Sequence, residues 1–319
     1  MSKVESVSYK EFNRDRSMLR KVPVYNSKTD FGPKTDVYTK AKDFVLKNPK
    51  KVAFGALAIA GIIASTVLLA TKGKPLLINL EGNKILSKAD KINQQAGSVI
   101  ENAEKEYNSV LNLLVESRPD NFNTVFDENG AVVRRFIEKD SAYLMQELSG
   151  EKITRESMFN PEQLSIKTIM KDVEHISDSR IKAREGFSYD KGELNSYMKG
   201  IFANIYDENP SKSKFKTIIE FKDGQLFSCI KDAKMDNENL AYKEGYKFID
   251  DKLRKYESGV KSGLNTSKVG KEFNFDNGKV GEYRKNIELF FSEEKPEIAE
   301  KVKEHYVVND SGKLEKQKI

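Results

Sequence analysis

The sequence predicts an α+β protein with a single transmembrane helix, a helical neck, and an antiparallel β-hairpin sheet with covering helices. Three observations support this fold class. Residues 52–71 form an uncharged apolar run of twenty residues, although 33% of the chain is charged. A heptad pattern follows the run, and five short windows beyond it share a hairpin pattern. The expected parts are a basic flexible tail (1–51), the transmembrane helix (52–71), the neck (72–118) and an α+β hairpin-repeat domain (119–319).

The tail is basic and lacks a regular apolar pattern. It holds 13 Lys and Arg against 6 Asp and Glu, a composition typical of a segment that buries too little apolar surface to fold. The whole chain is at +6, so residues 75–319 carry −3 once the +7 of the tail and the +2 of Lys72 and Lys74 are subtracted. A body at −3 is not typical of a nucleic-acid binder, and we expect no nucleic acid among the partners.

The apolar run has the length of a membrane span. Twenty helical residues cover about 30 Å, the thickness of the hydrocarbon core of a bilayer. Lys50 and Lys51 precede the run and Lys72 and Lys74 follow it, where long cationic side chains reach lipid head groups. Lysines are more numerous before the run than after it, which predicts a cytoplasmic N-terminus and an extracytoplasmic C-terminal domain in a bacterial cell membrane. A cleaved signal peptide and a buried core helix are the alternatives.

The neck carries a heptad seam. Apolar residues recur at alternating steps of four and three, with one polar break at Glu106: Ile85, Ala89, Ile92, Ala96, Val99, Ala103, Glu106, Val110 and Leu113. This pattern fits a self-associating coiled coil, and it fits an amphipathic helix that docks on its own domain. Small residues within the span, such as Ala60 and Ala64, offer a second route to a homo-oligomer.

The distal part repeats a hairpin. Five windows (125–133, 188–195, 220–227, 274–281 and 307–315) set an apolar residue three or four positions before a glycine and another two positions after it. Asp-Gly and Asn-Gly turns favour type I′ geometry, because both central residues need positive φ. The glycines of these hairpin turns are Gly130, Gly192, Gly224, Gly278 and Gly312.

The turns fix the expected strand register. Phe221 should face Leu226, and the same rule gives the pairs Phe275/Val280 and Tyr189/Leu194, with Phe126/Val132 and Val308/Leu314 flanking longer bulged loops. Between the hairpins, apolar residues at helical spacing predict covering helices near 160–176, 242–256 and 296–304.

At these windows the sequence resembles bacterial hairpin-repeat proteins of the MORN and YwqK type, whose copies look like aromatic-x-x-G-x-aliphatic, and it is somewhat similar to YD-repeat segments. The resemblance covers about a third of the chain. It implies a hairpin sheet and a role in interaction or assembly, and it carries over no catalytic residue.

The search for a catalytic, metal-binding or cofactor-binding site assigns no residue. His175 and His305 have no Cys or second His near them, and Cys229 alternates with Phe227 as a small packed side chain would. Phosphate-binding, dinucleotide-binding and nucleophile-elbow motifs are missing, and no cofactor is expected. Carboxylates gather at the hairpin turns: Asp127, Glu128, Asp190, Glu193, Asp223 and Asp276.

Three function classes remain. The first is a single-pass membrane-anchored protein that displays a non-catalytic interaction or assembly domain to an unknown protein partner. The second is a membrane-tethered hydrolase that uses carboxylates on the sheet domain, and a secreted effector is a third option.

Overall fold

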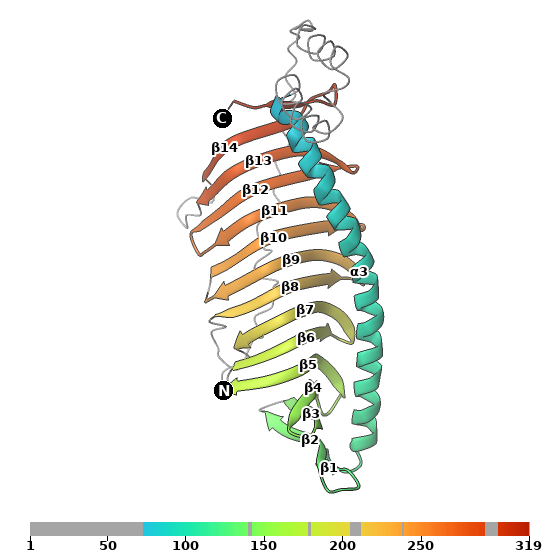
Figure 1. The fold of residues 1–319 in the computed structure, drawn as a ribbon. Coiled ribbons are helices and arrows are strands. Elements are labelled where there is room, and N and C mark those ends of the chain that lie inside the picture. The colour runs from blue at the N-terminus through green and yellow to red at the C-terminus, as the bar shows by residue number, and fades with distance from the viewer. Residues whose placement is uncertain are drawn as a thin grey trace, which may run out of the picture. The chain divides into compact units, whose positions relative to one another are not determined.

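The computed structural model describes residues 73–139, 142–177, 180–204, 212–237, 239–290 and 299–318. The chain divides into two units, 1–74 and 75–319, and nearly all described residues belong to the second. They form one long helix and one 15-stranded sheet in which every strand pairs antiparallel with its neighbours in chain order. The described part is therefore a continuous β-meander with a helix along it (Figure 1).

The helix is α3 (Gly73–Ser117), and the strands follow it in the chain. Their bounds are β1 (Val125–Phe126), β2 (Val132–Lys139), β3 (Ala142–Ser149), β4 (Lys152–Asn160), β5 (Ser165–Ser177), β6 (Arg180–Asp190), β7 (Glu193–Asn204), β8 (Ser213–Lys222), β9 (Gln225–Asp236), β10 (Asn239–Ile249), β11 (Lys252–Ser262), β12 (Thr266–Asp276), β13 (Lys279–Phe290), β14 (Ala299–Val308) and β15 (Leu314–Lys316).

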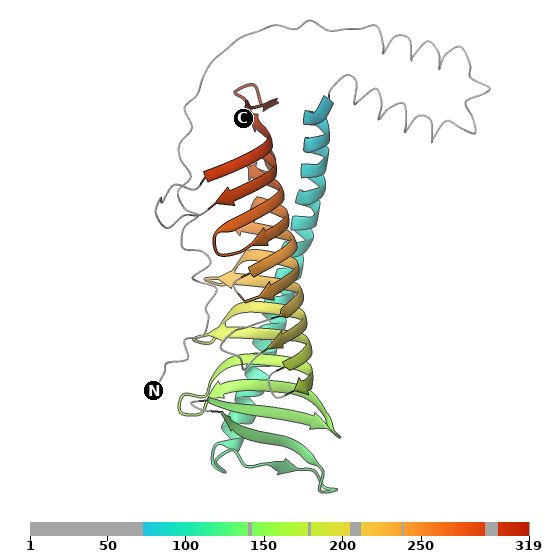
Figure 2. The ribbon, with the colours of Figure 1, turned by 90° about the vertical axis from the view of Figure 1, so that its left-hand side faces the viewer.

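Helix α3 lies across one end of the strands and runs against their chain order (Figures 1 and 2). Near its start Glu81 binds Lys271 on β12, and after its end Arg118 donates to the carbonyl of Glu162 in the β4–β5 turn. The helix residues that face the sheet are buried and follow heptad steps: Ile78, Gly82, Ile85, Ala89, Ile92, Ala96, Val99, Ala103, Val110, Leu114 and Ser117. The seam of the neck therefore packs on the protein's own sheet.

A row of large side chains receives this seam. The strand register places ten buried residues of β5–β14 side by side, most of them aromatic: Ile169, Phe187, Tyr197, Ile219, Cys229, Tyr246, Tyr256, Phe273, Tyr283 and Tyr306. These residues and the seam belong to one hydrophobic core. Each fully buried large apolar side chain contributes about 1.5–3 kcal/mol, so this contact makes a large contribution to the stability of the unit.

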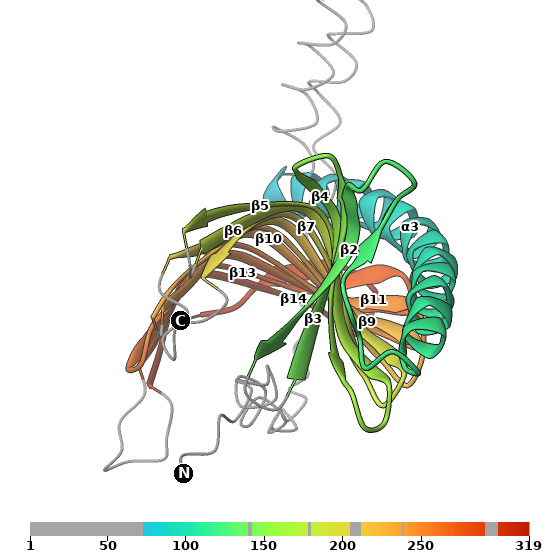
Figure 3. The same cartoon turned by 90° about the horizontal axis from the view of Figure 1, so that it is seen from below.

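A second row marks a bend on alternate strands of the sheet. Five residues in the middle of β5, β7, β9, β11 and β13 have a left-handed backbone and stand in register with one another, with φ between 51° and 63°: Asp172, Gly200, Asp232, Gly259 and Asn286. Only Gly, Asn and Asp adopt this conformation at small cost. We call this row the crease. Figure 3 shows how strongly the strands curve.

The crease divides the long strands into a helix-side limb and a far limb. Side chains of the far limb fold back onto the helix-side limb, because a Cβ on Gly186 would lie 2.9 Å from Ile201 Cδ1 and one on Gly245 would lie 2.7 Å from the Tyr242 ring. Two small buried clusters fill this bend, one around Ile181 and one around Ile287.

The five expected hairpins are part of the meander. The structure places Tyr189 opposite Leu194, Phe221 opposite Leu226 and Phe275 opposite Val280, and it also pairs Phe126 with Val132 and Val308 with Leu314. A further copy, β10–β11, pairs Phe248 with Leu253. Its turn is Asp250-Asp251, with φ of 50° and 56°, so it lacks the glycine that marks the other hairpins.

The predicted covering helices were wrong. The segments 160–176 and 242–256 are strands and their turns, and the described part of 296–304 belongs to β14. The fold class is corrected from an α+β domain with covering helices to a 15-stranded antiparallel meander with one described helix. The helical spacing came from interruptions of the strand alternation: Ile166 and Ile169 flank a bulge, and Val173 follows the left-handed Asp172.

The prediction of a single-pass membrane protein was wrong for the described part of the chain. No helix there has a stretch long and apolar enough to cross a bilayer, because Lys, Asp and Glu are spread along α3. The localisation in a cell membrane and the cytoplasmic N-terminus are therefore withdrawn. The apolar run itself, 52–71, lies outside the described residues, as does the tail 1–51.

The prediction of a coiled coil was also wrong. The neck is helical over 73–117, but its heptad seam is buried against the sheet of the same chain. Glu106, the polar break in the seam, faces cationic side chains of β4 and β5.

Candidate interaction surface

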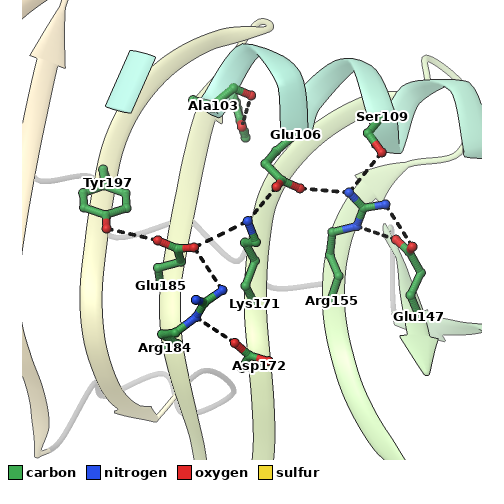
Figure 4. A network of polar contacts seen from close by, with 11 residues as sticks. Ala103, Glu106, Ser109, Glu147, Arg155, Lys171, Asp172, Arg184, Glu185 and Tyr197 are labelled. Atoms are coloured by element: carbon green, nitrogen blue, oxygen red, sulfur yellow. Dashed lines mark hydrogen bonds and ion pairs between the residues drawn. The ribbon is translucent and has the colours of Figure 1, made fainter. Parts of the chain in front are cut away.

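A charged clamp joins α3 to the sheet at the polar break (Figure 4). Glu106 binds Lys171 on β5 at 2.6 Å and Arg155 on β4 at 2.8 Å, and Arg155 also contacts Glu147 and Ser109. Burial alone would raise the pKa of the Glu106 carboxyl, but hydrogen bonds and charges from Lys171 and Arg155 outweigh it, so this pKa lies below its ordinary value. Glu106, Arg155 and Lys171, which form this charged clamp, hold α3 on the sheet through ion pairs.

The same network continues along β5, β6 and β7. Lys171 lies 3.4 Å from Glu185, which accepts a hydrogen bond from the Tyr197 hydroxyl at 3.1 Å. Burial and the charge of Glu185 raise the pKa of Tyr197 to about 12, so this phenol stays protonated. Arg184 binds Asp172 at the crease at 2.7 Å. These contacts link the helix-side limb to the crease (Figure 4).

Two further ion pairs set the position of α3. Lys271 on β12 binds Glu81 at 2.6 Å, and Lys88 binds Glu244 on β10 at 2.8 Å. Burial would raise the pKa of Glu244, but Lys88 and the Tyr246 hydroxyl outweigh it and lower that pKa. Together with Glu106, these pairs fix the register of the helix along the sheet.

A buried carboxylate holds β3, β4 and β5 together on the other face. Glu156 is 3% exposed, accepts a hydrogen bond from Gln146 at 2.5 Å and lies 2.8 Å from His175 Nε2. Arg135 donates to Gln146 at 2.6 Å. The sequence alone does not predict this contact of His175, because its partners Glu156 and Gln146 come from other strands.

A larger cluster links β11 to β14. Lys255 lies between the buried carboxylates Glu257 (2.8 Å) and Glu272 (2.6 Å), and Arg284 also binds Glu272. Burial lowers the pKa of Lys255, but the charges of the two carboxylates outweigh it, so this pKa is raised. His305 binds Glu282 at 2.7 Å beside Arg284. The two buried carboxylates, Glu257 and Glu272, each have a cationic partner, which suits a structural role.

The sequence-predicted site residues do not converge. Gly192, Gly224 and Gly278 occupy two-residue turns next to α3, and Gly130 and Gly312 occupy longer loops, all with positive φ. The six turn carboxylates lie with them on separate hairpins. Lys74 is exposed in the first turn of α3, whereas Lys50, Lys51 and Lys72 lie outside the described residues.

Neither a metal site nor a reactive thiol stands out in the part of the chain that the structure describes. No group of three His, Cys, Asp or Glu side chains there could hold a metal ion. Cys229 is 1% exposed, and burial raises the pKa of its thiol to about 12, so it stays protonated.

The outward face of the far limb carries two neighbouring rows of mostly exposed side chains. The first row consists of the crease residues and the residues that face them on the even-numbered strands β6 to β14. The next row away from α3 also runs in register from β5 to β14. Its residues are Glu174, Lys182, Phe202, Lys214, Lys234, Ala241, Lys261, Lys268, Glu288 and Lys301. Most of these side chains are exposed, whereas those that alternate with them, such as Ala183 and Val260, are buried in the bend.

Comparisons with known proteins assign no family. No family model matches the chain, and no curated protein matches it. The resemblance of the hairpins to MORN and YwqK-type repeats stays a prediction.

Proposed function

We propose that the chain is a non-catalytic interaction or assembly protein that presents the outward face of the far limb to an extended protein partner. The observation that carries the proposal is the continuous row of mostly exposed side chains that crosses β5–β14 in register. Ten neighbouring strands at about 4.8 Å per step make this row about 43 Å long.

The construction of the sheet supports this proposal. An extended surface binds with less loss of conformational freedom when its frame is already ordered. Here α3 braces the strands along its whole length through the seam and three charged contacts. The short end strands β1 and β15 cover part of each sheet edge, which leaves the broad face as the larger contact area.

Site-directed photo-cross-linking tests the proposal. Since Cys229 is buried, a cysteine placed on the surface can be labelled selectively with a photoreactive maleimide. The labelled positions would be Glu174→Cys on β5, Ala241→Cys on β10 and Glu288→Cys on β13, in the full-length protein. The matched control is Ser98→Cys, which is exposed on α3.

We expect all three sheet positions to yield an adduct with the same partner after irradiation in an extract of the source cells. Because β5 and β13 are eight strands apart, a common partner at both positions means that it lies along the sheet. Adducts at Ser98 alone, or different partners at each position, would contradict the proposal.

A further inference from the structure

Cationic side chains dominate the outward face of the far limb. In the two exposed rows from β5 to β14 the basic residues outnumber the acidic ones, ten to four. The basic residues are Lys182, Arg184, Lys214, Lys216, Lys234, Lys243, Lys261, Lys268, Lys301 and Lys303, and the acidic ones are Asp172, Glu174, Asp232 and Glu288. Residues 75–319 as a whole carry −3, so positive charge is concentrated here.

Ion pairs compensate part of the charge toward the two ends of these rows. Arg184 binds Asp172 and Lys182 binds Glu174 at one end, while Lys268 binds Glu288 at 3.0 Å toward the other, although Lys301 and Lys303 on β14 form no ion pair with a described residue. The strands in the middle hold no ion pair within these rows. Five exposed lysines on β8–β11 form no ion pair with another described residue, and we call them the lysine patch: Lys214, Lys216, Lys234, Lys243 and Lys261.

The register places like charges directly opposite one another. Lys214 on β8 is the cross-strand partner of Lys234 on β9, and Lys261 on β11 is the partner of Lys268 on β12. Directly opposed like charges destabilise a sheet. Asp232 and Asp236 are the nearby acidic side chains on β9, and neither forms an ion pair with the patch. An anionic ligand across these strands would relieve the repulsion.

We propose that the lysine patch binds an extended acidic segment, rich in Asp and Glu, of the partner protein. This proposal rests on the proposed function and adds the chemistry of the partner. Lysine presents a compact point charge on a flexible stem, which suits carboxylates whose positions vary along a chain. Charge complementarity therefore selects an acidic segment. Because the lysines stand in register, the bound segment would run across the strands, along the row of lysines.

The residues around the patch favour an acidic peptide over a nucleic acid. Between β8 and β12 the two exposed rows hold Lys, Asp, Gly and Ala and include no aromatic residue or arginine. Proteins that bind single strands stack bases on aromatic side chains, and those that read base edges favour the arginine fork. Carboxylates need neither feature.

The dimensions give a length for the segment. From Lys214 on β8 to Lys261 on β11 the row takes three strand steps, which is about 14 Å at 4.8 Å per step. An extended peptide rises about 3.3 Å per residue, so about four residues span the patch. Every second side chain would then point at the lysines.

Fluorescence anisotropy with a labelled twelve-residue polyglutamate peptide and the full-length protein tests this proposal. The patch variant is the triple substitution Lys214→Gln, Lys234→Gln and Lys261→Gln. The matched control is Lys222→Gln, Lys252→Gln and Lys279→Gln, which removes the same charge from exposed lysines near the hairpin turns. Circular dichroism would confirm that both variants fold.

We expect the patch variant to bind polyglutamate about tenfold more weakly than the unaltered protein, and the control to change less than twofold. Added salt should weaken the binding. An equal loss in both variants would mean unspecific attraction and overturn the proposal, as would no binding of the peptide. Tighter binding of a thymidine oligonucleotide of equal charge would favour a nucleic acid. If the cross-linking experiment still succeeds, the interaction function stands without this partner chemistry.

Discussion

The two limbs of the sheet are built from the same strands but bury their side chains differently. The helix-side limb packs a row of large, mostly aromatic residues against the seam of α3 in one continuous core. The far limb buries two small clusters in the bend and turns lysines outward. The left-handed residues of the crease separate the limbs. One set of strands can therefore supply a stable frame at one end and an exposed binding surface at the other.

The largest expected effect concerns the seam. Ile92 is 3% exposed against the sheet, so Ile92→Asp would bury a charge without a partner and should lower the free energy of unfolding by about 3–5 kcal/mol. Urea denaturation measures this change. The matched control Gln94→Asp, on the exposed side of α3, should stay within about 0.5 kcal/mol. Equal effects of the two substitutions would contradict a helix docked through its seam.

The next effect concerns the charged clamp. Glu106→Gln removes the shared partner of Arg155 and Lys171, but each cation keeps a second carboxylate, so we expect a loss of about 1–3 kcal/mol at neutral pH. The pKa of Glu106 is lower in the folded than in the unfolded state. The stability it contributes is therefore present above the ordinary carboxyl value of 4.5 and is lost as pH falls through the folded value.

Stability measured from pH 7 down to acid should show this linkage. The unaltered protein should lose stability below about pH 5, and the Glu106→Gln variant should lose less of it over the same range. Parallel curves for the two proteins would mean that the clamp contributes no linked stability.

A smaller effect distinguishes the crease from the helix. Gly259 has a φ of 63°, so Gly259→Ala should cost about 1–2 kcal/mol. Gly97 lies in α3 with open space around its Cα, so Gly97→Ala should stabilise the protein by about 1 kcal/mol. Thermal and urea unfolding would report both changes. A stabilising Gly259→Ala would contradict the left-handed crease.

The smallest effect is on the lysine patch. Lys214→Gln should leave the free energy of unfolding within about 0.5 kcal/mol and shift it toward greater stability, because it removes the charge opposite Lys234. The comparison with Lys222→Gln, an exposed lysine on the same strand without a cross-strand lysine, isolates this repulsion. A clear destabilisation by Lys214→Gln would show that this lysine supports the fold.

The sequence was sufficient for the helix of the neck and for the glycine-marked hairpins, because a heptad seam and an Asn-Gly or Asp-Gly turn are local signals. The sequence pattern predicted helices wrongly where the alternation of buried and exposed residues along a strand is interrupted. Ile166, Ile169 and Val173 have helical spacing because a bulge and the left-handed Asp172 each shift the pattern. The membrane prediction rested on residues 52–71, which lie outside the described part.

The candidate surface had a partial signal in the sequence. Residues that tolerate a left-handed backbone recur 27 to 32 positions apart, from Asp172 through Gly200 to Asn286, and they mark the crease. The lysines beside them are scattered along the chain and meet only when the strands pair. The same holds for Glu106 and Lys171, which are 65 positions apart. No local pattern predicts such pairs.

Hydrogen exchange of the full-length protein, with and without the polyglutamate peptide, tests most directly whether the two limbs have different roles. Without the peptide, the amides of α3 and of the helix-side limb should exchange slowly and together, since they share one core. With the peptide, added protection should be confined to the far limb of β8–β11, around Lys214, Lys234 and Lys243. Added protection on α3 or at the hairpin turns instead would contradict the account.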